Sequence, residues 1–514
     1  MFTTQNSRSG ELTFFINGKA VHSLYNPTAE ADTFLKRQIF TNIPQIFILM
    51  GPGLGYLKKS VSKSYPKASL LSIHLDKWIF EHADKTGNNW VYKDNIDLAS
   101  KLSFTIPDFL LSETTIIEWH PCLKHFPDRT KFIKKIIHQF FQERKGSIVT
   151  TGQFGRKWIR NTYYNFLKQS NFVEFNSINL PILIAASGPS LKESITIMQN
   201  KRDKFLLAAL PSSLTALNAA CLQPDFIFHT DPGFWANEHL KYIRNTKIPV
   251  IMPLTSSFNT NLKNPVVCIN QGSFIENLIL GNFFPHVPSH GTVAGTAYLF
   301  LRKITDNPII FLGLDFRFTD IMEHVSPHSF DILYNIKQNR FDGYLNILYE
   351  KQKISTTRAL STYSGWFESK TKISNAYRYN PTDISTDGLI SIDLENISTL
   401  LNTTGDKNKS KFLINETNLS FNKRTLFDVL RHLILLLDEF KSEIPFMSSD
   451  HISNFFIKSN PLSELFQYTA YSDILKLTNY YRNDLDKSHD ILNRIYAEAK
   501  DFIMGLSERS NYER

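Results

Sequence analysis

The residues with the clearest chemical potential lie in one turn near the middle of the 514-residue chain: Ser187, Gly188, Pro189, Ser190 and Leu191. An apolar run, 182–186, precedes this turn, and a helix-compatible segment follows it to residue 198. Backbone N–H groups at the start of a helix attract anions, and two hydroxyl groups lie beside them here. The pattern fits a site for a phosphate group, and it fits an ordinary strand–helix connection equally well.

Polar residues also end other short apolar runs of the chain: Ser212 after 205–210, Asp231 after 226–230 and Asp315 after 308–314. These runs alternate with helical segments, which predicts a parallel, doubly wound α/β sheet. The carboxyl ends of parallel strands meet at one edge, where ligands bind such sheets. We therefore expect Ser187, Ser212, Asp231 and Asn270 or Gln271 to share one edge, with the strand end at Asp315 beside them.

Two further features follow along the chain. Gly291 and Thr292 open a helix rich in small residues, which can pack close to a sheet or a ligand. His324 and His328 are four residues apart, a spacing that suits two metal ligands on a helix. Pro327 interrupts such a helix and no third ligand is evident, so we expect no metal site.

The elements before this region predict a Rossmann-like N-terminal domain. Alternating residues around Asn17-Gly18 indicate a hairpin, and the strand 46–50 leads into the glycine-rich loop Gly51–Gly55. The loop fits a cofactor site or a purely structural turn. Pro52 removes one backbone donor, and no acidic residue follows the second strand before Asp76, which favours the structural interpretation. Further on, we expect a helix that ends at Gly146, a strand over 147–152 and a second helix to residue 168.

The C-terminal part differs in composition. Residues 350–395 are polar and rich in Ser and Thr, which fits a lid over a pocket or a surface segment, and TTGDKNKSK after residue 402 reads as a linker. The remainder shows helical periodicity, as expected for a stabilising bundle or a docking module for a partner. We predict an N-terminal Rossmann-like domain over 1–165, a central α/β domain over 166–400 and a helical domain over 401–514.

Composition narrows the class of protein. The chain is 42% hydrophobic and 20% charged, with a formal net charge of +9, a balance that suits anionic ligands without requiring nucleic acid. Its three cysteines are far apart, which argues against a disulfide framework. No apolar run approaches the length of a membrane span, and no signal-peptide pattern opens the chain. We therefore expect a cytoplasmic protein.

Three blocks carry a resemblance to a known family: GPSL at 188–191, PDFIFHTDP at 224–232 and the segment 290–324. Together they resemble the central domain of the Maf (motility-associated factor) flagellin glycosyltransferases. The N-terminal FINGKAVHSLYNPTAEA and ILMGPGLGY blocks resemble the same family, so the likeness covers about the first 395 residues. It implies an enzyme that moves a nonulosonic acid of the pseudaminic or legionaminic type from a CMP-activated donor onto Ser or Thr of flagellin, a step needed for flagellum assembly and motility.

The central domain is also similar to bacterial sialyltransferases that use CMP-sialic acid. That resemblance implies that the turn 188–191 contacts the nucleotide and that His324 is the base, with His328 as second choice. Asp231 or Asp315 would stabilise a positively charged transition state, and no tightly bound cofactor is expected beyond the CMP donor. The residues that we expect around the nucleotide are Ser187, Gly188, Pro189, Ser190, Leu191, Ser212, Gly291, Thr292 and Arg317.

The sequence departs from the sialyltransferase pattern at two places. Ser187 stands where that pattern has Asn, and Phe316-Arg317-Phe318 replaces tyrosines that help the phosphate to leave, although Arg317 can neutralise phosphate charge. Two alternatives therefore remain. One is a flagellin-binding chaperone or scaffold with a degenerate site, and the other is an enzyme like the archaeal pterin diphosphokinases, which have a related central domain.

Overall fold

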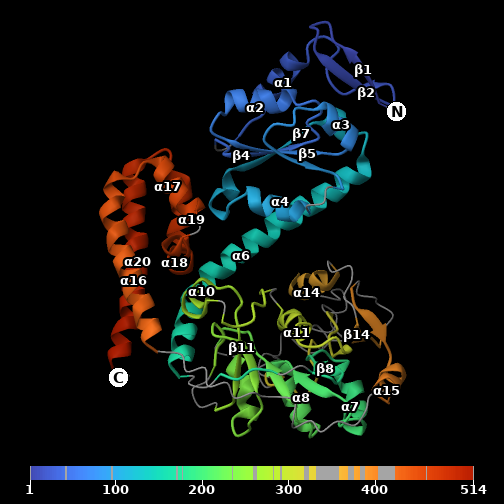
Figure 1. Ribbon diagram of the computed structural model, residues 1–514, viewed down its shortest axis with the longest axis vertical. Coiled ribbons are helices and arrows are strands. Elements are labelled where there is room, and N and C mark those ends of the chain that lie inside the picture. Colours follow the sequence, from blue (N-terminus) through green and yellow to red (C-terminus); the bar gives the residue numbers. More distant parts are fainter. Residues whose placement is uncertain are drawn as a thin grey trace, which may run out of the picture. The chain divides into compact units, whose positions relative to one another are not determined.

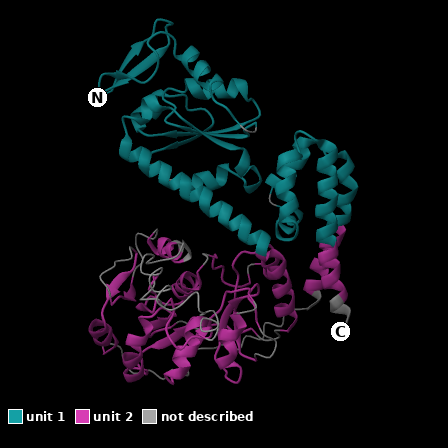
Figure 2. Ribbon diagram, turned by 180° about the vertical axis from the view of Figure 1, so that it is seen from behind, with its two compact units in different colours: residues 1–153, 436–500 teal, residues 154–435, 501–514 magenta. Residues whose placement is uncertain are grey.

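The structure is a computed structural model, and it describes residues 2–40, 43–93, 97–168, 172–175, 178–233, 236–258, 263–281, 283–289, 292–317, 323–331, 358–368, 375–381, 388–402, 423–458 and 460–512. The chain divides into two compact units (Figure 2). Unit 1 comprises residues 1–153 and 436–500, and unit 2 comprises residues 154–435 and 501–514. Unit 1 is thus built from two stretches of sequence, with almost all of unit 2 between them.

Unit 1 opens with a three-stranded antiparallel sheet made of β1 (Phe2–Asn6), β2 (Leu12–Ile16) and β3 (Lys19–Ala20). Asn17 and Gly18 join β2 to β3 with φ of 50° and 76°, the left-handed values that a tight hairpin requires. The hairpin predicted at this dipeptide is confirmed. Helix α1 (Pro27–Lys36) follows, and its first turn is capped by the Asn26 side chain, which accepts from the Ala29 N–H.

A four-stranded parallel sheet in the order β6-β5-β4-β7 forms the centre of unit 1. Its strands are β4 (Ile46–Met50), β5 (Ser69–His74), β6 (Asn88–Val91) and β7 (Thr114–Glu118). The connecting helices are α2 (Tyr56–Ser64), α3 (Lys77–His82), α4 (Leu98–Thr105), the 3-10 helix η1 (Asp108–Glu113) and α5 (His120–Leu123). Figure 1 shows α2 on one face of the sheet and α4 on the other, the doubly wound arrangement of the predicted Rossmann-like domain.

The glycine-rich loop after β4 is filled by a side chain of the protein itself. The Leu54 N–H donates to His22 Nε2 at 3.0 Å, and a Cβ added at Gly53 (φ +62°) would lie 2.2 Å from that nitrogen. His22 is 3% exposed, and burial lowers its pKa to about 3, so the ring is neutral and can accept this hydrogen bond. The loop therefore fastens the N-terminal hairpin to the parallel sheet, which supports the structural interpretation of Gly51–Gly55.

Helix α6 (Pro127–Lys168) is one continuous helix of 42 residues. The predicted helix end at Gly146 and the predicted strand over 147–152 are wrong. A glycine within a helix costs only about 1 kcal/mol relative to alanine, and packing can outweigh that cost. Gly152 provides such packing within unit 1, because a Cβ there would lie 2.3 Å from the ring of Tyr471.

The C-terminal region is helical, as predicted. Its elements are α16 (Lys423–Glu443), η5 (Ile444–Phe446), α17 (Ser449–Ile457), α18 (Pro461–Thr469), α19 (Tyr471–Tyr480) and α20 (Leu485–Tyr512). Within unit 1 this region packs on the N-terminal part. Tyr481 donates from its hydroxyl to Glu113 Oε2 at 2.9 Å, and Phe109 stacks on Phe456 with 4.9 Å between ring centroids. Residues 436–500 thus complete unit 1. This grouping differs from the three consecutive domains that the sequence predicts.

Unit 2 contains an eight-stranded parallel sheet in the order β12-β11-β10-β9-β8-β13-β14-β15. Its strands are β8 (Ile182–Ala185), β9 (Leu206–Ala209), β10 (Phe226–Phe228), β11 (Val250–Pro253), β12 (Val266–Ile269), β13 (Ile309–Leu312), β14 (Ala376–Tyr379) and β15 (Ile390–Ile392). The predicted doubly wound parallel sheet is confirmed. The strand order reverses beside β8, whose neighbours are β9 and β13, and ligands of such sheets bind at this switch point.

The helices that lie between these strands are α7 (Leu191–Asn200), η2 (Pro211–Ser213), α8 (Leu214–Ala219), α9 (Ala236–His239), η3 (Leu240–Ile243), α10 (Phe274–Leu280), α11 (Val293–Leu301) and α14 (Arg358–Glu368). Helix α15 (Leu394–Asn402) follows the last strand, β15. The segment 350–395, expected as a lid or a surface segment, contributes α14 and two strands of the sheet where it is described. Among the helices of the described residues, none is both long and apolar enough to cross a membrane.

We predict that Gly53→Ala destabilises the protein more than Gly87→Ala. Both glycines have a positive φ, +62° and +68°, but a Cβ at Gly87 meets nothing within 4 Å, whereas one at Gly53 collides with His22. The collision should cost about 1–3 kcal/mol of unfolding free energy beyond the backbone strain that both variants share. Urea unfolding of the two variants measures the difference, and equal losses would show that His22 does not hold the loop.

Candidate functional site

The ends of β8 and β13 meet more closely than side chains allow. The Gly188 N–H donates to Gly313 O at 2.7 Å, and the Ala186 N–H donates to Leu312 O at 2.8 Å. A Cβ added at Gly188 would lie 2.5 Å from Gly313 O, and Gly313 itself has φ of +71°. Both glycines are therefore required by the close approach of the two strand ends at the switch point.

The turn predicted to bind phosphate holds a carboxylate of the protein. Ser190 donates to Asp315 twice, from its N–H to Oδ2 at 2.8 Å and from its hydroxyl to Oδ1. The other N–H groups of the turn also have partners, since Leu191 donates to Gly188 O and Lys192 to Pro189 O. Asp315 thus occupies the anion position at the start of α7, and a phosphate that used these backbone donors would have to displace it.

Asp315 lies beside a buried arginine that the sequence analysis missed. Arg378, on β14, is 4% exposed and donates from Nη1 to Leu314 O at 3.1 Å. Burial lowers the pKa of Arg378, and the negative charge of Asp315 opposes this shift. The alternating pattern of AYRY at 376–379 is the signal that could have identified this strand.

A chain of side-chain contacts leads from the end of β9 to His324. Ser212 donates from its hydroxyl to Ser187 Oγ at 2.9 Å, and Ser187 Oγ lies 3.1 Å from His324 Nδ1. The backbone supports this contact, since the Val325 N–H donates to Ser187 O at 2.7 Å. Three of the predicted site residues, from distant parts of the sequence, are thereby brought together.

The Ser187–His324 contact permits two tautomers of the imidazole. When Ser187 donates to Nδ1, the neutral ring carries its proton on Nε2 and has no base at that nitrogen. When Nδ1–H donates to Ser187, the lone pair lies on Nε2, and the Ser187 hydroxyl proton is available to another acceptor. Only the second tautomer makes Nε2 of His324 a proton acceptor.

Within the described residues, the other predicted site residues take no part in the contacts between Ser212, Ser187 and His324. Asp231 is exposed, and its Oδ1 accepts from the Gly233 N–H at 2.6 Å. Arg317 is half-buried, and Thr292 precedes α11 without capping it through its side chain. Gly291 lies outside the described residues. The roles predicted for these residues stay predictions.

Two histidines surround His324, and one of them, His239, was missed. His328 stacks on His324 with 4.4 Å between ring centroids and 14° between ring planes, and His239 lies 5.3 Å from His328. Burial, as the largest cause, and the neighbouring imidazoles together lower the pKa of His239 and of His328 to about 4. Within the described residues, no three His, Cys, Asp or Glu side chains form a group that could hold a metal ion.

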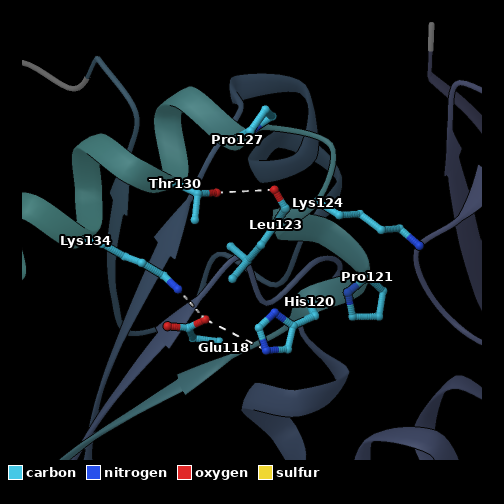
Figure 3. Close-up of a pocket in the computed structure, with 8 residues that line it drawn as sticks. All are labelled: Glu118, His120, Pro121, Leu123, Lys124, Pro127, Thr130 and Lys134. Carbon is cyan, nitrogen blue, oxygen red and sulfur yellow. Dashed lines mark hydrogen bonds and ion pairs between the residues drawn. The ribbon is translucent and has the colours of Figure 1, made fainter.

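A pocket of about 460 Å³ lies elsewhere, in unit 1, at the end of β7 (Figure 3). Its lining residues are Glu118, His120, Pro121, Leu123, Lys124, Pro127, Thr130 and Lys134. The Glu118 carboxylate is already paired, at 2.7 Å from Lys134 Nζ and 3.9 Å from His120 Nε2. The pocket contains none of the predicted site residues, and we place the candidate site at the switch point of unit 2 because the interacting polar side chains lie there.

The chain is similar to one family model and to two proteins of known sequence. A family model described as 6-hydroxymethylpterin diphosphokinase MptE-like matches residues 156–321. Two uncharacterised proteins of Treponema pallidum (strain Nichols) are similar in sequence. One is 27% identical over 311 residues, which span 57% of this chain and 66% of the relative, just under two thirds. The other is 23% identical over 214 residues, which span 38% of this chain and 73% of the relative.

Among solved structures, a Maf glycosyltransferase from Magnetospirillum magneticum AMB-1 matches with a TM-score of 0.64 at 11% sequence identity. The match covers 99% of this chain and 92% of that chain. The chain therefore has the fold of a Maf glycosyltransferase over nearly its whole length, which confirms at the level of the fold the resemblance noted in the sequence. At 11% identity, this structural match establishes the fold and does not establish the reaction.

We predict that Asp315→Asn lowers the free energy of unfolding by about 1–3 kcal/mol. The substitution weakens both hydrogen bonds from Ser190 and removes the negative charge beside buried Arg378. Urea unfolding measures the loss. Asp203→Asn is the matched control, because that side chain is 67% exposed and lies 4.0 Å from its nearest cation. Equal stability of the two variants would contradict a structural role for Asp315.

Proposed function

We propose that this protein is a glycosyltransferase that transfers a nonulosonic acid, of the pseudaminic or legionaminic type, from its CMP-activated form to Ser or Thr hydroxyls of flagellin. The observation that carries the proposal is the contact between Ser187 and His324 at the switch point of a Maf glycosyltransferase fold. The sequence blocks at 188–191, 224–232 and 290–324 support the donor and the acceptor by resemblance alone.

In this reaction the acceptor oxygen forms a bond to the anomeric carbon of the sugar. The bond from that carbon to the phosphate oxygen breaks, and its electron pair leaves with CMP. The acceptor hydroxyl proton passes to Nε2 of His324, which requires the tautomer whose Nδ1–H donates to Ser187. Ser212, which donates to Ser187 Oγ, helps to fix that hydroxyl, so the two serines act on the base by orienting it.

In this scheme, the charge on the sugar ring and the charge on the leaving phosphate are stabilised by different residues. The transition state carries positive charge on the sugar ring, which an exposed carboxylate such as Asp231 can stabilise. Asp315 is engaged with Ser190, so it supports the turn and acts on the ligand only if the turn opens. Arg317 is the residue that we assign to the leaving phosphate in place of the absent tyrosine hydroxyls.

We predict that His324→Ala abolishes the addition of sugar to flagellin while the protein remains folded, because the variant lacks the imidazole that accepts the proton in this scheme. Intact-mass measurement of flagellin from cells that carry the variant tests this. His138→Ala, an exposed position on α6, is the control and should leave the flagellin mass unchanged from wild type. Full glycosylation in the His324→Ala strain would refute the base assignment.

One observation favours a second function. The family model that matches residues 156–321 is described as a pterin diphosphokinase, whose substrate would be ATP rather than a CMP-sugar. We predict that the purified protein binds CMP and not ATP, as titration calorimetry can measure. Preferential binding of ATP would favour the diphosphokinase. If neither nucleotide binds and flagellin mass does not depend on this protein, the chaperone or scaffold alternative stands.

A further inference from the structure

The strongest feature outside the Ser187–His324 pair is the group formed by His239 and His328. His239 ends α9, and His328 lies in the described segment 323–331, almost ninety residues along the sequence. Their rings lie 5.3 Å apart, and His328 stacks on His324. Two imidazoles are thus held beside the candidate base by separate parts of the chain.

Both rings carry a nitrogen that is buried and lacks a hydrogen-bond partner within the described structure: Nδ1 of His239 and Nε2 of His328. His328 is 6% exposed, and its Nδ1 accepts from the Phe330 N–H at 3.3 Å, so the neutral ring carries its proton on Nε2. A buried N–H without an acceptor is unfavourable, and buried polar groups in proteins almost always have partners. The N–H of His328 therefore calls for an acceptor atom that the described chain does not supply.

The acceptor that fits is an oxygen that carries negative charge. A metal ion does not fit, because Nε2 of His328 bears a proton and the rings of His324 and His328 face each other in a stack. An anion fits, because it accepts from N–H groups and offsets the charge of a protonated imidazole. The nearby turn cannot serve the same anion without a rearrangement, since Asp315 already takes its donors.

We propose that His239 and His328 form a subsite for an anionic oxygen group of the ligand, either a carboxylate or a phosphate. The source of this group rests on the proposed function: it belongs to the nucleotide sugar, which carries a carboxylate on its nonulosonic acid and a phosphate on its CMP. The subsite selects a charged donor over a neutral one, and it lies next to the histidine that accepts the proton.

Occupation of the subsite couples binding to proton uptake. The groups that act on His239 are His324, His229 and Lys241, which oppose its protonation, and Asp231, which favours it; those that act on His328 are His324 and His239, which oppose protonation, and Asp331, which favours it. Burial is the largest effect at both rings, and both pKa values are about 4 without ligand. A bound anion raises them, so the complex takes up protons and affinity rises as the pH falls from neutral toward 4.

NMR of the full-length protein, labelled with ¹³C in its histidines, tests the subsite without assuming any reaction. The His239→Gln and His328→Gln variants assign the two signals, and His138→Gln is an exposed control. The probes are sulfate, as a phosphate analogue that does not titrate near neutral pH, and free N-acetylneuraminic acid, as a carboxylate. At equal ionic strength, at least one probe should raise the pKa of His239 or His328 relative to chloride. Once the two signals are assigned, this titration is measured on the wild-type protein.

The variants then identify the source of the anion. Because a hydrogen bond to a charged group typically contributes 1.5–3 kcal/mol, each Gln variant should bind the effective probe about tenfold more weakly at pH 6. An effect with sulfate assigns the phosphate, and an effect with the sugar acid assigns the carboxylate. Unchanged pKa values with both probes, or variants that bind them as tightly as wild type, would overturn the subsite. A subsite that responds in a protein that does not bind CMP would instead contradict the proposed function alone.

Discussion

The close approach of the ends of β8 and β13 is the constraint on which the candidate site depends. The hydrogen bond from Gly188 to Gly313 leaves no room for a side chain on either strand end. At that distance Asp315 reaches Ser190 and closes the turn before α7. The same strand end fixes Ser187, whose carbonyl binds the segment that carries His324. A single backbone contact therefore helps to determine where His324, the turn and the Asp315 carboxylate lie.

The fold of unit 2 could be predicted because its strands are short apolar runs separated by helices, and that pattern requires a parallel sheet. The topology then placed Ser187, Ser212 and Asp315 at neighbouring strand ends before any distance was known. The interpretation failed where local signals conflicted with packing. Gly146 and the β-branched residues after it indicate a helix end, yet Gly152 packs against Tyr471 and the helix continues through both.

Other parts of the site could not be predicted, because they depend on contacts between residues far apart in the sequence. Nothing local marks His239, on a four-residue helix, as a neighbour of His328. The use of the turn's donors by Asp315 is hidden in the same way, since sequence shows an empty anion site and structure shows an occupied one. His22 likewise fills the glycine-rich loop of unit 1 from a separate hairpin. At the Ser190 turn and at the glycine-rich loop, a polar side chain of the protein thus takes the place that a ligand could have taken.

The division of unit 1 into two stretches of sequence has a consequence for synthesis on the ribosome. The Tyr481 hydroxyl that binds Glu113 is 368 residues further along the chain. At typical rates of translation this separation takes roughly 20 to 70 s, during which all of unit 2 up to residue 435 leaves the ribosome. The N-terminal sheet therefore emerges first and completes its packing late, with Phe109 and Glu113 exposed until the last helices arrive. This interval, rather than the mature fold, is when the protein is most dependent on protection from aggregation.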